Sequence, residues 1–153
     1  MLPSPVFLEK TRMNLNELNS VANAMVGAGK GILAADESTP TIGKRFDTIN
    51  TESTEASRQR YREMLFTTPG VADYIGGVIL FDETLRQSTS DGVPFAKYMS
   101  DLGMVPGIKV DMGAKPLAGF PGETITEGLD GLRDRLAEYY DLGARFAKWR
   151  AVI

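Results

Sequence analysis

Short apolar runs alternate with amphipathic helical patterns along this chain of 153 residues. Strands that alternate with helices are joined by right-handed βαβ crossovers into a parallel sheet, which is either open and doubly wound or closed into a barrel. The chain has room for four such units, half of a barrel that takes about 250 residues when complete. We therefore expect an α/β fold, the N-terminal half of a (β/α)8 barrel ending in its fourth strand. One partial domain is expected over residues 1–153, with an extension and a helix in residues 1–30 and the strands in residues 31–153.

The spacing of apolar residues locates the elements. Residues 76–81 are apolar throughout, as a strand covered on both faces should be. Apolar residues three and four apart indicate helices, and Ser53 is the expected cap of the second one. The Gly- and Pro-rich residues 113–122 are expected to form a long loop on the active face. Strands are expected at residues 31–35, 76–81, 105–111 and 144–153, and helices at residues 15–26, 51–66, 95–102 and 127–142.

Charged residues alternate with apolar ones in the last two predicted strands. Lys109 and Asp111 face one side of their strand, and Lys148 and Arg150 face one side of the next. The apolar sides must pack against helices, so the charged sides are expected to face the barrel interior, where an unpaired charge is costly. Internal ion pairs, Lys109 with Asp111 or Lys148 with Asp36, are one explanation. The other is an active site for an anionic substrate at the C-terminal strand ends.

The turn after the first strand, residues 36–45, combines hydroxyl groups with two cations. Hydroxyls donate hydrogen bonds to phosphate, and an arginine fork matches the oxygens of a phosphate group. This turn is therefore a candidate phosphate site. The alternative is a helix N-terminus capped by Ser38, with Lys44 and Arg45 in solvent.

The composition limits the chemistry, because the chain has neither cysteine nor histidine. Disulfides, thiolate chemistry, Cys-bound zinc, and Ser/His or Cys/His catalysis are all excluded. Lys, Asp, Glu and Tyr remain as candidate acids, bases and nucleophiles. The net charge of −3 gives no global positive field for nucleic acid or an anionic membrane, and residues 1–10 lack the cationic region of a secretory signal. We therefore expect a cytoplasmic protein with no nucleic-acid or membrane partner.

Five segments of the sequence together resemble class I fructose-bisphosphate aldolases, in the order that this family shows them. The resemblance covers nearly the whole chain. The segments are Gly31-Ile-Leu-Ala-Ala-Asp-Glu-Ser38, Gly77-Val-Ile-Leu-Phe-Asp-Glu-Thr-Leu85, Pro106-Gly-Ile-Lys-Val-Asp111, Gly128-Leu-Asp-Gly-Leu132 and Gly143-Ala-Arg-Phe-Ala-Lys-Trp-Arg150.

The resemblance implies a TIM barrel that cleaves fructose 1,6-bisphosphate reversibly into dihydroxyacetone phosphate and glyceraldehyde 3-phosphate. It implies a lysine Schiff base, no metal and no other cofactor, and a homotetramer when the protein is full length. Asp36 would assist the covalent chemistry, and Lys148 would stabilise charge and aid proton transfer. The implied substrate- and phosphate-binding residues are Lys109, Ser38, Thr41, Arg45, Arg58 and Arg150.

Two departures from the family pattern matter. Pro40 and Thr41 differ from the usual forms of the turn after the first strand. The Schiff-base lysine and the glutamate acid/base of the family belong to later strands, which these 153 residues do not include. The isolated chain is therefore expected to be inactive. The alternative is a noncatalytic half-barrel module that binds a phosphorylated sugar.

Overall fold

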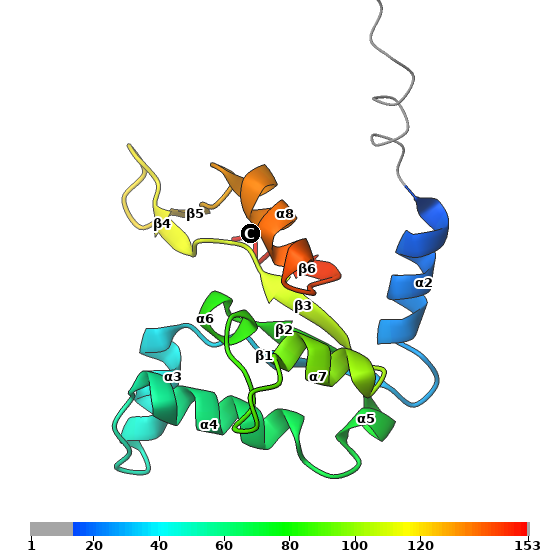
Figure 1. The fold of residues 1–153 in the computed structure, drawn as a ribbon. Helices are drawn as coiled ribbons and strands as arrows, with labels where there is room; N and C mark the ends of the chain where they lie inside the picture. Colours follow the sequence, from blue (N-terminus) through cyan, green and yellow to red (C-terminus); the bar gives the residue numbers. More distant parts are fainter. Residues whose placement is uncertain (1–13, 153) are drawn as a thin grey trace, which may run out of the picture.

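The structure is a computed structural model that describes residues 14–152. The expected extension in residues 1–13 and the last residue of the predicted fourth strand lie outside the described residues. One four-stranded parallel sheet forms the centre of the fold, in the order β1-β2-β3-β6 (Figure 1). The predicted half barrel is confirmed. Its strands are β1 Gly31–Ala35, β2 Ile75–Leu80, β3 Val105–Lys109 and β6 Phe146–Lys148.

The register of the strands defines two faces of the sheet. Ala34 lies opposite Ile79, Ile79 opposite Gly107, and Gly107 opposite Phe146, so these residues share the face that also carries both strand lysines. We call this the inner face. A Cβ atom on Gly107 would lie 2.3 Å from Cζ of Phe146, so the phenyl ring occupies the space above the glycine. Only a residue without a side chain fits at that position in β3.

Helices cover the other face of the sheet, where the apolar core lies. Val78, Leu80 and Ile108 point to this side and are almost fully buried. The rings of Phe66 and Phe95 pack edge to face at 5.3 Å between centroids and join two of the helices. The covering helices are α4 Glu55–Phe66, α7 Phe95–Asp101 and α8 Leu132–Asp141, with α3 Thr39–Asp47 and the short α5 Val71–Tyr74 and α6 Asp82–Leu85 at the sheet ends.

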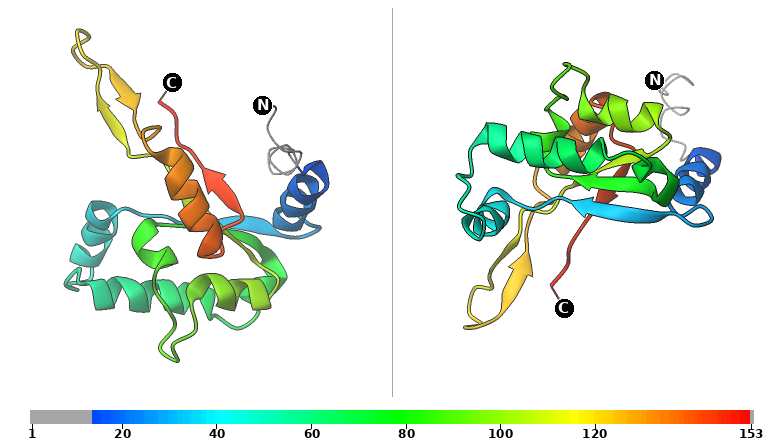
Figure 2. Two further views of the ribbon diagram at one scale, coloured as in Figure 1. Left: turned by 45° about the horizontal axis from the view of Figure 1, so that its top comes forward. Right: turned by 90° about the horizontal axis from the view of Figure 1, so that it is seen from below.

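The N-terminal helix α2 Leu15–Met25 stands apart from the covering helices, near the start of the strands (Figure 2). Its last residues contact the sheet: a Cβ on Gly76 would lie 2.7 Å from the Ala24 carbonyl oxygen and 2.5 Å from that of Met25, and a Cβ on Gly77 would lie 3.1 Å from Cγ of Met25. Gly77 belongs to the inner face. None of the α2 residues is buried, and Leu15 and Leu18 are each 56% exposed. This helix therefore contacts the sheet near its C-terminus, while its N-terminal leucines stay exposed.

The second predicted helix begins later than expected and buries two arginines. Its N-cap is Thr54 instead of Ser53, because Thr54 and Ser57 exchange side-chain and backbone hydrogen bonds in a capping box. The buried side chains of α4 include Arg58 and Arg62, each with carboxylate and carbonyl partners. Polar partners thus allow arginines at positions that apolar periodicity does not identify.

The segment after β3 is more regular than the predicted loop. The predicted loop, residues 113–122, contains the strand β4 Ala114–Pro116. This strand pairs with β5 Thr124–Thr126 in an antiparallel hairpin. The following helix starts at Leu132, not at residue 127, because Gly128 and Gly131 adopt positive φ angles of 130° and 64°. The fourth strand is also shorter than residues 144–153, since only Phe146–Lys148 pairs with β3.

Candidate functional site

The C-terminal ends of the strands bring charged residues together at one end of the inner face. Asp36 follows β1 directly, and Lys148 is the last residue of β6. These strands are the two outer strands of the sheet, yet Nζ of Lys148 donates a hydrogen bond to Oδ2 of Asp36 at 2.6 Å. The ion pair therefore crosses the mouth of the half barrel, where barrel enzymes place their chemistry.

A second ion pair lies beside the first, at the end of β3. Nζ of Lys109 donates to Oδ1 of Asp111 at 2.6 Å and to the Asp111 carbonyl oxygen at 2.7 Å. The backbone N–H groups of Gly113 and Arg150 also donate to the Asp111 carboxylate, each at 3.2 Å. Burial raises the pKa of Asp111, but the hydrogen bonds from Lys109 and Arg150 and the lysine charge outweigh it, so that pKa lies below its ordinary value.

Both ion pairs that the sequence allowed are therefore formed. Ion pairing does not remove the lysines from solvent, since the Lys109 and Lys148 side chains stay 17% and 30% exposed. The mouth thus offers two ammonium groups to an incoming anion. Paired carboxylates hold both groups in place.

The candidate phosphate turn is the start of helix α3. Ser38 occupies the N-cap position, as the alternative interpretation required, but its side chain makes no capping bond. Its Oγ instead lies 3.0 Å from Oγ1 of Thr41. Pro40 is accommodated in the first turn of the helix, where a proline needs no backbone donor. The two hydroxyls are side by side, and their contact with phosphate stays a prediction.

Within residues 14–152, the remaining predicted arginines make no side-chain hydrogen bond to Asp36 or Lys148. Arg45 forms an ion pair with Glu37 and is 56% exposed. Arg58 is bound in a fork to Glu83, with bonds of 2.8 and 2.6 Å, and these bonds lower the pKa of Glu83 below its ordinary value. Arg150 has an exposed side chain two residues beyond β6. The structure therefore brings Asp36 and Lys148 together but binds Arg45 and Arg58 to other carboxylates.

Two arginines that the sequence analysis did not select contact the strand ends from the helix-covered side of the sheet. Arg62 of α4, which is 1% exposed, donates from Nε to the Ala35 carbonyl oxygen at 3.0 Å. Arg135 of α8 donates from Nη1 to the Val110 carbonyl oxygen at 3.1 Å. Positions 58, 62 and 66 lie on one helix face, so the buried Phe66 in that series was a signal for Arg62.

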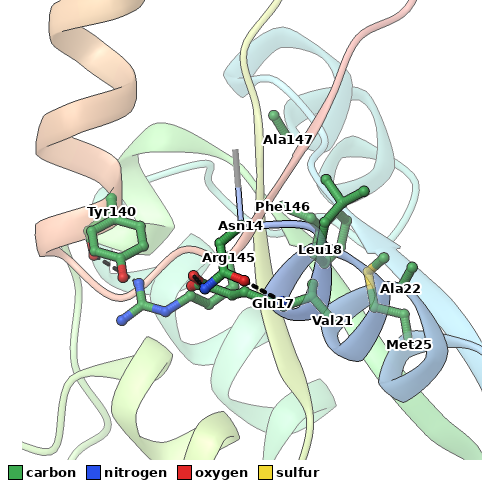
Figure 3. A pocket seen from close by; sticks show the side chains of 10 residues that line it. All are labelled: Asn14, Glu17, Leu18, Val21, Ala22, Met25, Tyr140, Arg145, Phe146 and Ala147. Atoms are coloured by element: carbon green, nitrogen blue, oxygen red, sulfur yellow. Dashed lines mark hydrogen bonds between the residues drawn. The ribbon is translucent and has the colours of Figure 1, made fainter. Parts of the chain in front are cut away.

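A cavity of about 440 Å³ lies between α2 and β6, at the other end of the inner face (Figure 3). Leu18, Met25 and Phe146 give it a largely apolar lining. Glu17 and Arg145 are its charged residues. None of the predicted site residues lines this cavity, so the mouth is the better candidate for chemistry on an anionic substrate.

The described part of the chain has neither a cluster of metal ligands nor a helix that could span a membrane. Across residues 14–152, no three acidic side chains gather closely enough to hold a metal ion. No helix in the same range is long and apolar enough to cross a membrane.

Comparison with known proteins gives consistent matches. The family model described as "Fructose-bisphosphate aldolase class-I" matches residues 17–153. A "Probable fructose-bisphosphate aldolase class 1" of Xanthomonas campestris pv. campestris is 67% identical over 141 residues, which are 92% of this chain and 42% of that protein. The cytoplasmic isozyme of fructose-bisphosphate aldolase from Spinacia oleracea is 60% identical over 138 residues, or 90% of this chain and 39% of the isozyme.

A solved structure shows the same fold. The fructose-bisphosphate aldolase of Plasmodium falciparum, crystallised with TRAP and a small-molecule inhibitor, superposes with a TM-score of 0.85 at 52% sequence identity. The match covers 88% of this chain and 39% of the Plasmodium chain. The chain thus spans about two fifths of the length of the proteins it matches.

Proposed function

Because the chain belongs to the class I fructose-bisphosphate aldolase family, we propose that it provides the first half of an active site for reversible cleavage of fructose 1,6-bisphosphate. The products would be dihydroxyacetone phosphate and glyceraldehyde 3-phosphate. The observation that carries the proposal is the 2.6 Å contact between Lys148 and Asp36 across the mouth of the half barrel. A cation and a carboxylate in contact at strand ends are suited to moving protons and stabilising charge on a sugar.

In this proposal Lys148 and Asp36 have complementary catalytic roles. The Lys148 ammonium stabilises negative charge that develops on a substrate oxygen and donates a proton to it. The Asp36 carboxylate accepts hydrogen bonds from hydroxyl groups at the reacting carbons and assists the covalent step. Their present contact keeps both groups at the mouth before substrate enters.

Phosphate binding is proposed for a second group of residues. Lys109 has an ammonium group held beside Asp111 and partly open to solvent, which supports a role in binding an anionic phosphate. The adjacent hydroxyls of Ser38 and Thr41 support phosphate binding at the start of α3. Two further ligands, Arg45 and Arg58, would have to exchange their carboxylate partners for substrate, whereas Arg150 is exposed. These six residues are the proposed substrate-binding residues of the half site.

The rest of the proposed active site belongs to a longer protein. The family mechanism needs a Schiff-base lysine and a glutamate acid/base on later strands, so the 153-residue chain alone is proposed to be inactive. We assign residues 1–153 to a single partial domain of that protein. The cytoplasmic and cytosolic isozymes among the relatives support a cytosolic location. A homotetramer is proposed for the full-length form.

A hybrid enzyme tests this proposal. The matched 141 residues of the Xanthomonas campestris relative are replaced by those of this chain, and the unmodified relative is assayed in parallel. We expect the hybrid enzyme to cleave fructose 1,6-bisphosphate and to form an adduct with dihydroxyacetone phosphate that borohydride traps. The 153-residue chain alone should form none. A folded but inactive hybrid would refute the proposal.

The noncatalytic alternative has its own outcome in the same experiment. Under that alternative, the isolated chain would be monomeric, unfold cooperatively and bind fructose 1,6-bisphosphate tightly, while the hybrid enzyme would have no activity. Calorimetric titration of the isolated chain with the sugar bisphosphate measures this directly. The exposed inner face, on which Ile32 is 42% exposed, argues against a self-sufficient module.

A further inference from the structure

All of the side-chain hydrogen bonds of Arg62 go to the two residues that flank Asp36. Nε donates to the Ala35 carbonyl oxygen at 3.0 Å. Nη2 donates to the Glu37 carbonyl oxygen at 3.0 Å and to Glu37 Oε2 at 2.8 Å. The Arg62 and Glu37 side chains are 1% and 8% exposed. One buried guanidinium therefore holds the backbone on both sides of Asp36 without touching the Asp36 carboxylate.

These contacts determine where Asp36 points. Holding the carbonyl group of residue 35 fixes the peptide plane that enters Asp36, and holding the carbonyl group of residue 37 fixes the plane one residue beyond it. Both bonds limit rotation of the backbone between them and so restrict the direction of the Asp36 Cα–Cβ bond. Ala35 is the last residue of β1, so beyond it the sheet no longer holds the backbone. Arg62 supplies the hydrogen-bond donors that a neighbouring strand would otherwise give to this backbone. Asp36 lies in the same stretch, and its carboxylate has to reach Lys148 from there.

A related contact occurs just beyond β3, on one side of the aspartate only. Arg135 of α8 donates to the carbonyl oxygen of Val110, the residue before Asp111, and to that of Gly128. Two helices on the outer side of the sheet thus each send an arginine to the carbonyl that precedes a mouth carboxylate. Arg62 is buried and Arg135 is half-buried, and in both cases the guanidinium donates to the carbonyl oxygen just before an aspartate of the mouth. A buried guanidinium is costly to keep, so its place beside Asp36 calls for a reason.

We propose that Arg62 is a positioning residue for Asp36, which it directs toward Lys148 by holding residues 35 and 37 from the outer side of the sheet. The proposal rests on the proposed function only in so far as Asp36 is catalytic. It differs from a stabilising role, because a stabilising arginine would affect unfolding without changing the geometry at Asp36.

The first test is kinetic and uses the hybrid enzyme. Arg62→Lys keeps the positive charge but loses the planar fork, so kcat should fall on the order of 10- to 100-fold, as expected when a catalytic group is displaced by about 1 Å. KM should change less than kcat, because Arg62 touches none of the proposed phosphate ligands and is linked to Arg45 only through Glu37. The matched control is Arg60→Lys, an exposed arginine on the same helix, which should leave both parameters unchanged.

A double variant separates positioning from stability. Arg62→Met with Glu37→Gln removes both charges of the buried pair, so neither partner is left as an unpaired buried charge. We expect it to unfold near the parent's temperature and still to lose kcat. Normal kcat in this folded variant would overturn the proposal. Unfolding of both Arg62 variants would assign the residue to stability alone and would also overturn it.

The second test does not need activity. In the hybrid enzyme with 15N-labelled lysine, the Lys148 ammonium signal is identified by its loss in Lys148→Met. Its contact with Asp36 should slow proton exchange, and Arg62→Lys should speed that exchange as strongly as Asp36→Asn does. An unchanged signal in Arg62→Lys would contradict positioning. An inactive hybrid with a changed signal would refute the proposed function but keep the positioning role.

Discussion

The two ion pairs at the mouth have the same length and opposite origins. Lys109 and Asp111 are two residues apart at one strand end, whereas Lys148 and Asp36 are 112 residues apart and come from the outer strands of the sheet. Both lysines donate at 2.6 Å. The local pair therefore forms wherever β3 forms, while the distant pair requires the whole sheet.

The two pairs also differ in burial and in the number of hydrogen-bond donors to the carboxylate. The Asp111 side chain is 2% exposed and receives two backbone N–H groups besides its lysine, whereas the Asp36 side chain is 12% exposed, with Lys148 as its donor. Asp111 is thus part of the scaffold, and Asp36 is available to an additional ligand. A short ion-pair distance therefore does not tell a structural carboxylate from a catalytic one. The number of other hydrogen-bond donors to the carboxylate does.

The largest expected effect is on activity. In the hybrid enzyme, Lys148→Met should lower kcat on the order of 10²- to 10⁴-fold, the usual range for loss of a proton-transfer residue. Lys109→Met should mainly raise KM, because a phosphate ligand acts in substrate binding. Steady-state kinetics with fructose 1,6-bisphosphate measure both parameters, and the exposed Lys115→Met serves as the control. Equal kcat losses in the two mouth variants would remove the distinction between the pairs.

The next effect concerns stability, where the larger loss is expected at the Lys109–Asp111 pair and the smaller at the Lys148–Asp36 pair. Asp111→Asn should lower the free energy of unfolding by about 1–3 kcal/mol, because it weakens three hydrogen bonds in a buried site. Asp36→Asn should cost less, about 0–1 kcal/mol, since that pair is more exposed. Urea unfolding of the chain gives both values. A larger loss for Asp36 would mean that the distant pair holds the sheet together.

The dependence of stability on pH tests the same two carboxylates. The pKa of Asp111 is lower in the folded chain than its ordinary value of 3.8. Its stabilising contribution is therefore fully present above that value and is lost as the pH falls through the lower folded pKa. Unfolding measured from pH 5 to pH 2 should show a steeper loss in the parent than in Asp111→Asn. Parallel curves would show that other carboxylates dominate the acid response.

The smallest effect is expected at an exposed ion pair outside the candidate site, which serves as the reference. Lys97 and Asp101 lie 2.7 Å apart on the surface of α7, with side chains 64% and 58% exposed. Lys97→Met should change the free energy of unfolding by no more than about 0.5 kcal/mol, as is usual for exposed pairs one helical turn apart. Thermal unfolding at low and high salt tests this value. A cost equal to that of Asp111→Asn would make burial irrelevant to the comparison.

The sequence predicted the local pair more directly than the distant one. Alternation along β3 places Lys109 and Asp111 on one face by strand geometry alone. Lys148 and Asp36 could be paired because parallel strands end at the same edge of a sheet, a rule that depends on the correct topology. Arg62 was missed because its position looks like part of a polar helix surface until the carbonyl oxygen of Ala35 is known to lie there.

The errors in the fold have a common physical origin. The connection between β4 and β5 contains Gly119 and Gly122, and the late start of α8 follows Gly128 and Gly131. All four adopt positive φ angles, which composition does not reveal. The short β6 depends on how many residues find a partner on β3. Apolar periodicity locates the buried segments well, whereas their ends are set by backbone hydrogen bonds with distant residues.

The strand order β1-β2-β3-β6 is also the order in which a ribosome makes the strands. Each new strand therefore finds its neighbour already synthesised, and no strand has to wait for a partner farther along the chain. The sheet can grow by one edge at a time during synthesis. Contact between Asp36 and Lys148 must come last, because the chain between them has to be complete and in place before the two groups meet. The chemistry of the mouth would thus appear only at the end of that growth.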